Sequence, residues 1–214
     1  MSGSITLENR FGVNKMELIS LKHAIFVIAL LVLYYCFPKK YRWYVLLAGS
    51  MAYYVIICKW YVLFIIFTIC TTYGSTIWID KLLKKQNAIV KSHKEDWDRQ
   101  TRKEYKEKGR KKRVAVMLFA LLCNFGILAF LKYIPYAGEL GLLLPLGISF
   151  YTFQSMGYVM DVYREIVEPE KNFLKVALFV SFFPQIIQGP IAIYDKLAGQ
   201  LYEGHSLRLE NLQK

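Results

Sequence analysis

Three glutamines, Gln154, Gln185 and Gln188, lie within apolar stretches of the sequence. An amide that faces hydrocarbon is costly unless it is hydrogen bonded. Pro184 and Pro190 flank two of them, lack a backbone N–H and disrupt helical hydrogen bonding. Non-helical backbone at membrane depth occurs only where it is buried in protein or lines a watery cavity. Two interpretations therefore stay open: a polar cavity within the membrane, or a kinked helix whose amides join neighbouring helices.

Two stretches are thus unusual, one around Gln154 and one around Gln185 and Gln188. Neither contains a set of residues that could perform covalent or metal chemistry. His23, His93 and His205 all lie elsewhere, and a lone histidine of this kind is usually structural or solvated. The four cysteines form no CxxC pair and have no histidine at ligand spacing. The Gly147-x-Ser149 triplet lacks the nucleophile-elbow pattern. We therefore predict no catalytic residue and no metal site in this chain.

An acidic and a basic residue, Asp161 and Arg164, follow soon after the stretch that contains Gln154. They are three residues apart, so they could pair on one face of a helix at the membrane edge. A structural ion pair is the favoured interpretation over a catalytic one.

Long apolar segments must position these residues. About 20 apolar residues cross a bilayer core of roughly 30 Å. The run from 43 to 79 would be a helix of about 55 Å, too long for one crossing, so we divide it near Lys59. The sequence then predicts an all-α, polytopic transmembrane bundle in a single domain, 1–214, with six apolar segments at about 18–37, 43–58, 60–79, 114–131, 142–160 and 173–193.

A strongly basic stretch, 80–113, separates the third and fourth segments and accounts for much of the net charge of +12. We expect a solvated, partly helical loop. Nucleic-acid binding is disfavoured because few aromatic residues interleave the charges. Basic loops favour the cytoplasmic side, which places this loop inside the cell and the N-terminus outside. The lipid bilayer of the plasma membrane is the expected partner.

The two unusual stretches resemble the membrane-bound O-acyltransferase family. The first carries LPLGISFYTFQ at 144–154 and DVYR at 161–164. The second carries NFL at 172–174, FVSFFPQ at 179–185 and GPI at 189–191. The similarity is closer to the alginate O-acetyltransferase branch than to the teichoic-acid D-alanylation branch, and it is specific from about Leu144 to Leu201.

This resemblance implies a multi-helix enzyme with a funnel through the membrane, which moves an acyl group, usually acetyl, to hydroxyls of an exported polysaccharide. The donor would be acetyl-CoA or an acyl-carrier thioester, with no bound cofactor. Gln154, Asp161, Gln185 and Gly189 match motif positions and are candidates for lining the cavity, not for chemistry.

The resemblance also places the catalytic histidine of the family beyond this motif. We therefore expect the N-terminal portion of the enzyme, inactive alone, whose partners would be the missing C-terminal portion and possible envelope-modification proteins. Two alternatives stay open. One is a non-catalytic membrane module or scaffold within an envelope-modification complex. The other is a small transporter or channel, for which internal repeats would be expected and none is evident.

The orientation can be tested by labelling. A cysteine placed at Lys103 in a cysteine-free background should react with a membrane-impermeant maleimide only after the membrane is permeabilised, because the basic stretch is expected in the cytoplasm. A cysteine at Gly138, in the turn expected outside, is the control that should react in intact cells. Labelling at position 103 in intact cells would overturn the orientation.

Overall fold

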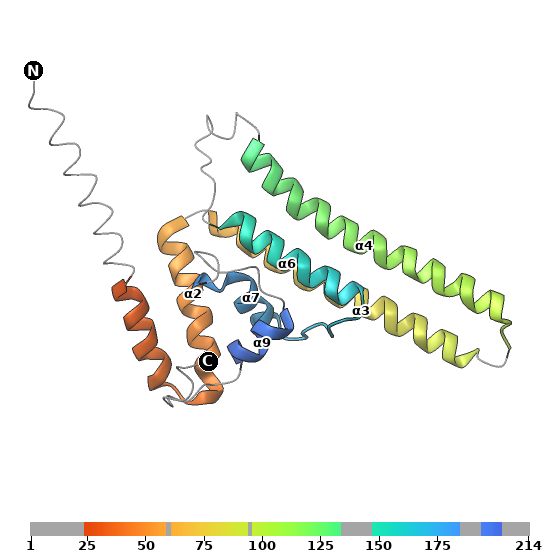
Figure 1. Cartoon of the computed structure of the whole chain (residues 1–214), viewed down its shortest axis with the longest axis horizontal. Coiled ribbons are helices and arrows are strands. Elements are labelled where there is room, and N and C mark those ends of the chain that lie inside the picture. Colours follow the sequence, from red (N-terminus) through yellow and green to blue (C-terminus); the bar gives the residue numbers. More distant parts are fainter. Residues whose placement is uncertain (1–23, 59–60, 94–95, 134–146, 185–193, 203–214) are drawn as a thin grey trace, which may run out of the picture.

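The computed structural model describes residues 24–58, 61–93, 96–133, 147–184 and 194–202, which contain helices and turns and no strand (Figure 1). The all-α prediction is confirmed for these ranges. After an apolar helix, Ala24–Cys36, the elements are η1 (Lys39–Tyr41), α2 (Arg42–Cys58), α3 (Val62–Ser92), α4 (Arg99–Tyr133), α6 (Ile148–Tyr163), α7 (Phe173–Ser181) and α9 (Tyr194–Tyr202).

Most of the basic stretch 80–113 is helical, so the described residues contain more helix than the solvated, partly helical loop that the sequence predicts. Helix α3 continues to Ser92, and α4 begins at Arg99, so a helical hairpin with a short turn replaces the loop. Residues with good helix propensity and pairs at i,i+4 spacing account for this. The Lys84 ammonium lies 2.6 Å from the Asp80 carboxylate. The far ends of α3 and α4 extend side by side beyond α6 (Figure 1).

The apolar halves of α3 and α4 bury polar side chains and expose apolar ones. Phe119 and Leu122 are 66% and 73% exposed, whereas Thr72 and Asn124 are 0% and 2% exposed. Water would favour the reverse, and contiguous exposed apolar surface is uncommon on soluble monomers. Hydrocarbon favours this arrangement, since small and polar residues hold membrane helices together.

Hydrogen bonds engage some of the buried polar side chains within this helix pair. The Asn124 amide donates to the Thr71 hydroxyl and to the Ala120 carbonyl, each at 2.9 Å. The Thr76 hydroxyl donates to the Thr72 carbonyl one turn earlier, at 2.9 Å. Within the described residues, Val62–Ser92 and Arg99–Lys132 are each long and apolar enough to cross a bilayer. They indicate a membrane protein.

The remaining four predicted spans are not shown as complete crossings. Helix α2 has 17 residues, α6 has 16 and α7 has 9. At 1.5 Å per residue α7 is about 13 Å long, less than half of a hydrocarbon core of about 30 Å. Residues 142–146 and 185–193, which belong to the fifth and sixth predicted spans, lie outside the described ranges.

Short helix α7 lies at the centre of the packing. Its last six residues, 176–181, are all buried, so it has no solvent face over that length. It contacts α2, α3, α6 and α9, while α6 packs against both α3 and α4 (Figure 1). The consequence is that α6 and α7, which carry the two unusual stretches, are held together inside the bundle.

Close approach of the polar halves of α3 and α4 depends on Gly109. A Cβ built there would collide with the side chain of Gln86. Gln86 is buried, and its amide nitrogen donates to the Lys106 carbonyl at 3.2 Å. Gly126, on the same helix, has no such neighbour within 4 Å.

Substituting these two glycines by alanine should separate packing from helix propensity. Each Gly→Ala change favours the helix to a similar extent, but Gly109→Ala displaces Gln86 and its hydrogen bond. We expect Gly109→Ala to be less stable than Gly126→Ala by about 1 kcal/mol. Thermal unfolding in detergent, followed by circular dichroism, measures the difference. Equal stabilities would show that the hairpin does not pack through Gly109.

Candidate functional site

Gln154 links the two unusual stretches directly. Its side chain is 3% exposed, and its Nε2 donates to the carbonyl oxygen of Phe179 at 2.9 Å. That carbonyl belongs to the last turn of α7, where carbonyls have no partner within the helix. The backbone leaves the helix at Phe182, whose φ of −61° and ψ of 100° are extended. Gln154 therefore satisfies an acceptor that the break in the helix sets free.

For Gln154 the structure shows the helix-joining role, one of the two interpretations left open by the sequence. Asp161 is half-buried near the end of α6. Gln185, Gln188 and Gly189 lie outside the described residues. Two cavities described below are lined by other side chains, so the lining of a membrane cavity by Gln154, Asp161, Gln185 and Gly189 stays a prediction.

The end of α6 is a turn of the Schellman type. The Ile166 N–H donates to the Asp161 carbonyl at 3.0 Å, and the Glu165 N–H donates to the Val162 carbonyl at 3.1 Å. Glycine usually occupies the left-handed position of this motif. Here Glu165 occupies it, with a φ of 62°. A non-glycine residue in this conformation is uncommon and costs free energy, so another interaction must hold it.

That interaction is an ion pair with Arg113 of α4. The guanidinium Nη1 donates to Glu165 Oε1 at 2.7 Å. The Arg113 side chain is 9% exposed and that of Glu165 is 52% exposed. The expected pair between Asp161 and Arg164 is absent from the ion pairs of the described residues, because the helix ends at Arg164 and the turn brings Glu165 beside α4. Sequence spacing could not reveal a partner that lies 52 positions away.

The ion pair borders two cavities. The larger, about 420 Å³, lies between the polar halves of α3 and α4. Its lining consists of Leu83, Gln86, Asn87, Lys103, Lys106, Glu107, Arg110, Arg113 and Glu165. The smaller, about 320 Å³, lies between α3 and residues 165–169. Its charged lining consists of Asp80, Lys84, Glu165 and Glu168.

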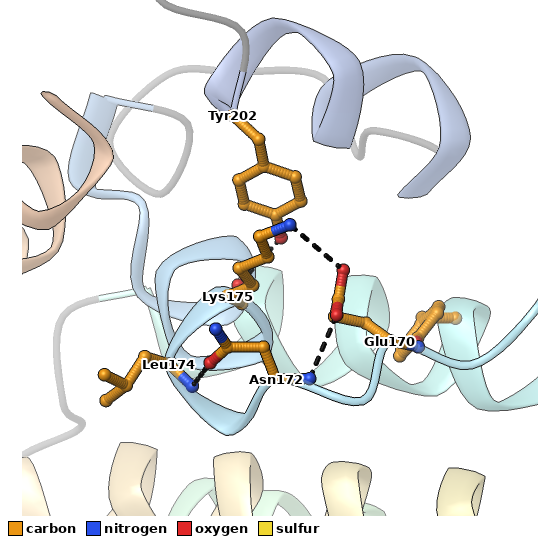
Figure 2. Close-up of polar contacts among 6 residues, drawn as sticks. Glu170, Asn172, Leu174, Lys175 and Tyr202 are labelled. Carbon is orange, nitrogen blue, oxygen red and sulfur yellow. Dashed lines mark hydrogen bonds and ion pairs between the residues drawn. The ribbon is translucent and has the colours of Figure 1, made fainter. Parts of the chain in front are cut away.

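A polar network fixes the start of α7 (Figure 2). The Asn172 side chain accepts from the Leu174 N–H at 3.0 Å, which caps the helix. Glu170 accepts from the Asn172 N–H at 2.9 Å and lies 3.7 Å from the Lys175 ammonium. The Glu170 N–H donates to the Tyr158 hydroxyl of α6 at 2.8 Å. The N-terminal end of α7 is thus tied to α6, as its C-terminal end is by Gln154.

Tyr202 attaches α9 to the same network (Figure 2). Its hydroxyl donates to the Lys175 carbonyl at 2.8 Å. Burial raises the pKa of the Tyr202 phenol above its ordinary value, because the charged form would lose its hydration. The group therefore stays protonated and keeps its donor. Nothing in the motif analysis indicated Tyr202, since its partner is a backbone atom.

The histidines that the sequence singled out take no part in the contacts described above. His93 is exposed at the hairpin turn, with its ring stacked 4.9 Å from that of Trp97. His23 and His205 lie outside the described ranges. No group of three or more metal-binding side chains occurs among the described residues.

Replacing Gln154 should destabilise the contact between α6 and α7. Gln154→Met keeps the side-chain volume but leaves the Phe179 carbonyl buried without its donor, which should cost about 1–3 kcal/mol. Gln100→Met is the matched control, because the Gln100 amide is exposed and bonds only to Glu104. Thermal unfolding in detergent measures both variants. Equal midpoints for the two would show that the Gln154 amide does not hold α7.

The chain is similar in part of its length to bacterial O-acetylases. A probable alginate O-acetylase of Pseudomonas syringae is 47% identical over 58 residues, which cover 27% of this chain and 11% of that protein. The Azotobacter vinelandii protein of the same description is 36% identical over 91 residues, 42% of this chain and 17% of its own length. A peptidoglycan O-acetyltransferase of Helicobacter pylori is 32% identical over 120 residues, 39% of this chain and 23% of its own length.

No family model matches the chain. No solved structure matches it significantly. The matched segments span about a tenth to a quarter of the length of the relatives described above. Over those segments, the chain is homologous to bacterial O-acetylases that act on alginate or peptidoglycan.

Proposed function

We propose that the chain forms part of a membrane-bound O-acyltransferase, of the alginate O-acetyltransferase-like branch, that acetylates hydroxyls of an exported envelope polysaccharide. One observation carries the proposal: identity of 46–47% over 58–59 residues with alginate O-acetylases. Buried polar contacts join α6 and α7, the helices that carry the motifs.

The proposed chemistry is transfer from a thioester donor, acetyl-CoA or an acyl-carrier thioester. A hydroxyl oxygen of the polysaccharide attacks the thioester carbonyl, the new C–O bond forms and the C–S bond breaks. A histidine of the remaining portion of the enzyme accepts the hydroxyl proton, which then passes to the departing thiolate. This chain lines the cavity and orients the reactants. Holding the reactants together in the right geometry lowers the barrier to transfer.

Gln154 has a positioning role in this proposal. Its bond to the Phe179 carbonyl fixes the place where α7 ends. The chain then continues through Pro184 towards Gln185 and Gly189, which we propose to line the cavity. Asp161 is proposed for the same cavity at the end of α6. A displaced α7 would shift this lining without removing any group from it.

The proposed location is the plasma membrane, with the α3–α4 hairpin in the cytoplasm. The basic hairpin would then face the side that holds acetyl-CoA and acyl carriers, while the polysaccharide is modified on the other side. Envelope-modification proteins are the proposed partners on that outer side. This arrangement requires a passage through the bundle, for which the backbone break at Phe182 and the prolines at 184 and 190 in the sequence are the supporting features.

A segment exchange tests the proposal. Residues 144–201 of this chain, which carry the family-like motifs, replace the corresponding segment of the probable alginate O-acetylase of Pseudomonas aeruginosa, a protein to which this chain is 46% identical over 59 residues. The chimera is expressed in a strain that lacks its own enzyme, and the acetyl content of secreted alginate is measured by NMR. We expect acetylation to be restored, because the exchanged helices supply an equivalent wall.

Two controls make the result interpretable. The chimera carrying Gln154→Met should reach the membrane and acetylate less, because α7 is displaced. A chimera with a scrambled segment of the same composition should be inactive. A correctly inserted chimera that yields no acetylated alginate would contradict the proposal and favour a non-catalytic membrane module.

A further inference from the structure

The cavity of about 420 Å³ between α3 and α4, here named the hairpin pocket, has the size of a small-molecule site. Lys103, Lys106, Arg110 and Arg113 supply its positive charges, against the carboxylates of Glu107 and Glu165. The lining is therefore net basic. The neighbouring cavity shares Glu165 but has three carboxylates, Asp80, Glu165 and Glu168, against Lys84, so it would repel an anion.

The bonding of Arg113 also indicates that this cavity binds an anion. Its side chain is 9% exposed, and Glu165 accepts from one of its terminal nitrogens. Arginine has five N–H donors, and burying a charge is costly unless hydrogen bonds compensate. Its Nε, buried, has no hydrogen-bond partner among the described residues. A planar guanidinium with unused donors matches the oxygens of a phosphate.

The depth of the pocket indicates where that phosphate would come from. Arg113 is the last charged residue of α4 before its apolar half. Arg110 and Lys106 lie about 4.5 Å and 10 Å further along the helix axis. The headgroup region on each side of a bilayer is about 5–8 Å thick. Arg113 and Arg110 therefore lie at headgroup depth, and Lys106 lies at its outer, aqueous edge, if α4 crosses the membrane along its apolar half.

We propose that the hairpin pocket binds the phosphate of an anionic phospholipid headgroup. Arg113 is the buried donor, Arg110 and Lys106 are the outer cations, and Glu165 orients Arg113. Basic pockets between membrane helices are a known way of binding anionic headgroups. The proposal depends on the membrane position of α4 and not on acyl transfer, so either can fail without the other.

The experiment compares two double variants of equal charge. Lys106→Gln/Arg110→Gln removes two cations from the pocket. Lys111→Gln/Lys112→Gln removes two exposed cations from the same helix that do not line it. Short-chain phosphatidylglycerol is titrated into the detergent-solubilised full chain, and Kd is measured by microscale thermophoresis. Short-chain phosphatidylcholine and inorganic phosphate are titrated in parallel.

We expect the pocket double variant to bind phosphatidylglycerol about thirty-fold more weakly than the parent chain. The exposed double variant should weaken binding less than about threefold, since solvent screens its charges. Inorganic phosphate binding with the same dependence on the pocket variant would support the site and assign a soluble phosphate as its source. Equal weakening by both double variants, or by neither, would overturn the proposal. Circular dichroism spectra verify that all variants fold.

Discussion

A polar group inside hydrocarbon has no water to bind, and this constraint shapes the whole molecule. Each membrane helix must satisfy its own backbone, and each polar side chain must find a partner in the protein. Helices α3 and α4 respond to this constraint with threonines such as Thr76 that bond to their own backbone and with the Asn124 amide nitrogen, which bonds to α3. Phe119 and Leu122 then remain on the outer surface, where a bilayer would solvate them.

The same constraint explains why α7 is short and central. A helix that stops at Ser181 leaves carbonyls exposed inside the bundle, and such an end is tolerable only if another element donates to them. Gln154 does so at one end, and Asn172 caps the other. Glu170 and Tyr202 connect that capped end to α6 and α9. A short helix can therefore persist inside the bundle.

Sequence reasoning predicted the features that depend on composition and local pattern. The all-α class, two apolar helices long enough to cross a membrane and the end of α7 before Pro184 follow from hydrophobic runs and from the missing N–H of proline. The importance of Gln154 followed from the cost of an amide in hydrocarbon. Its partner did not, because the Phe179 carbonyl is a backbone atom 25 positions away.

Features that depend on tertiary geometry were missed or wrongly predicted. The helical hairpin was expected as a solvated, partly helical loop because its charge density is typical of solvated chain, although i,i+4 pairing also suits a helix. The pair of Arg113 with Glu165 depends on a left-handed turn at a glutamate, where sequence patterns favour glycine. A signal did exist: Arg113 immediately precedes an apolar run, where a cation needs a partner or a headgroup.

The central claim is that α4 presents its apolar face to lipid and its polar face to α3. Electron paramagnetic resonance of spin labels in bilayers tests it most directly, by comparing collisions with oxygen, which concentrates in hydrocarbon, and with a water-soluble nickel chelate. Labels at Phe119 and Leu122 should collide frequently with oxygen and rarely with nickel, while labels at Ala120 and Asn124 should collide with neither. Frequent nickel collisions at Phe119 and Leu122, or strong oxygen accessibility at Asn124, would contradict the account.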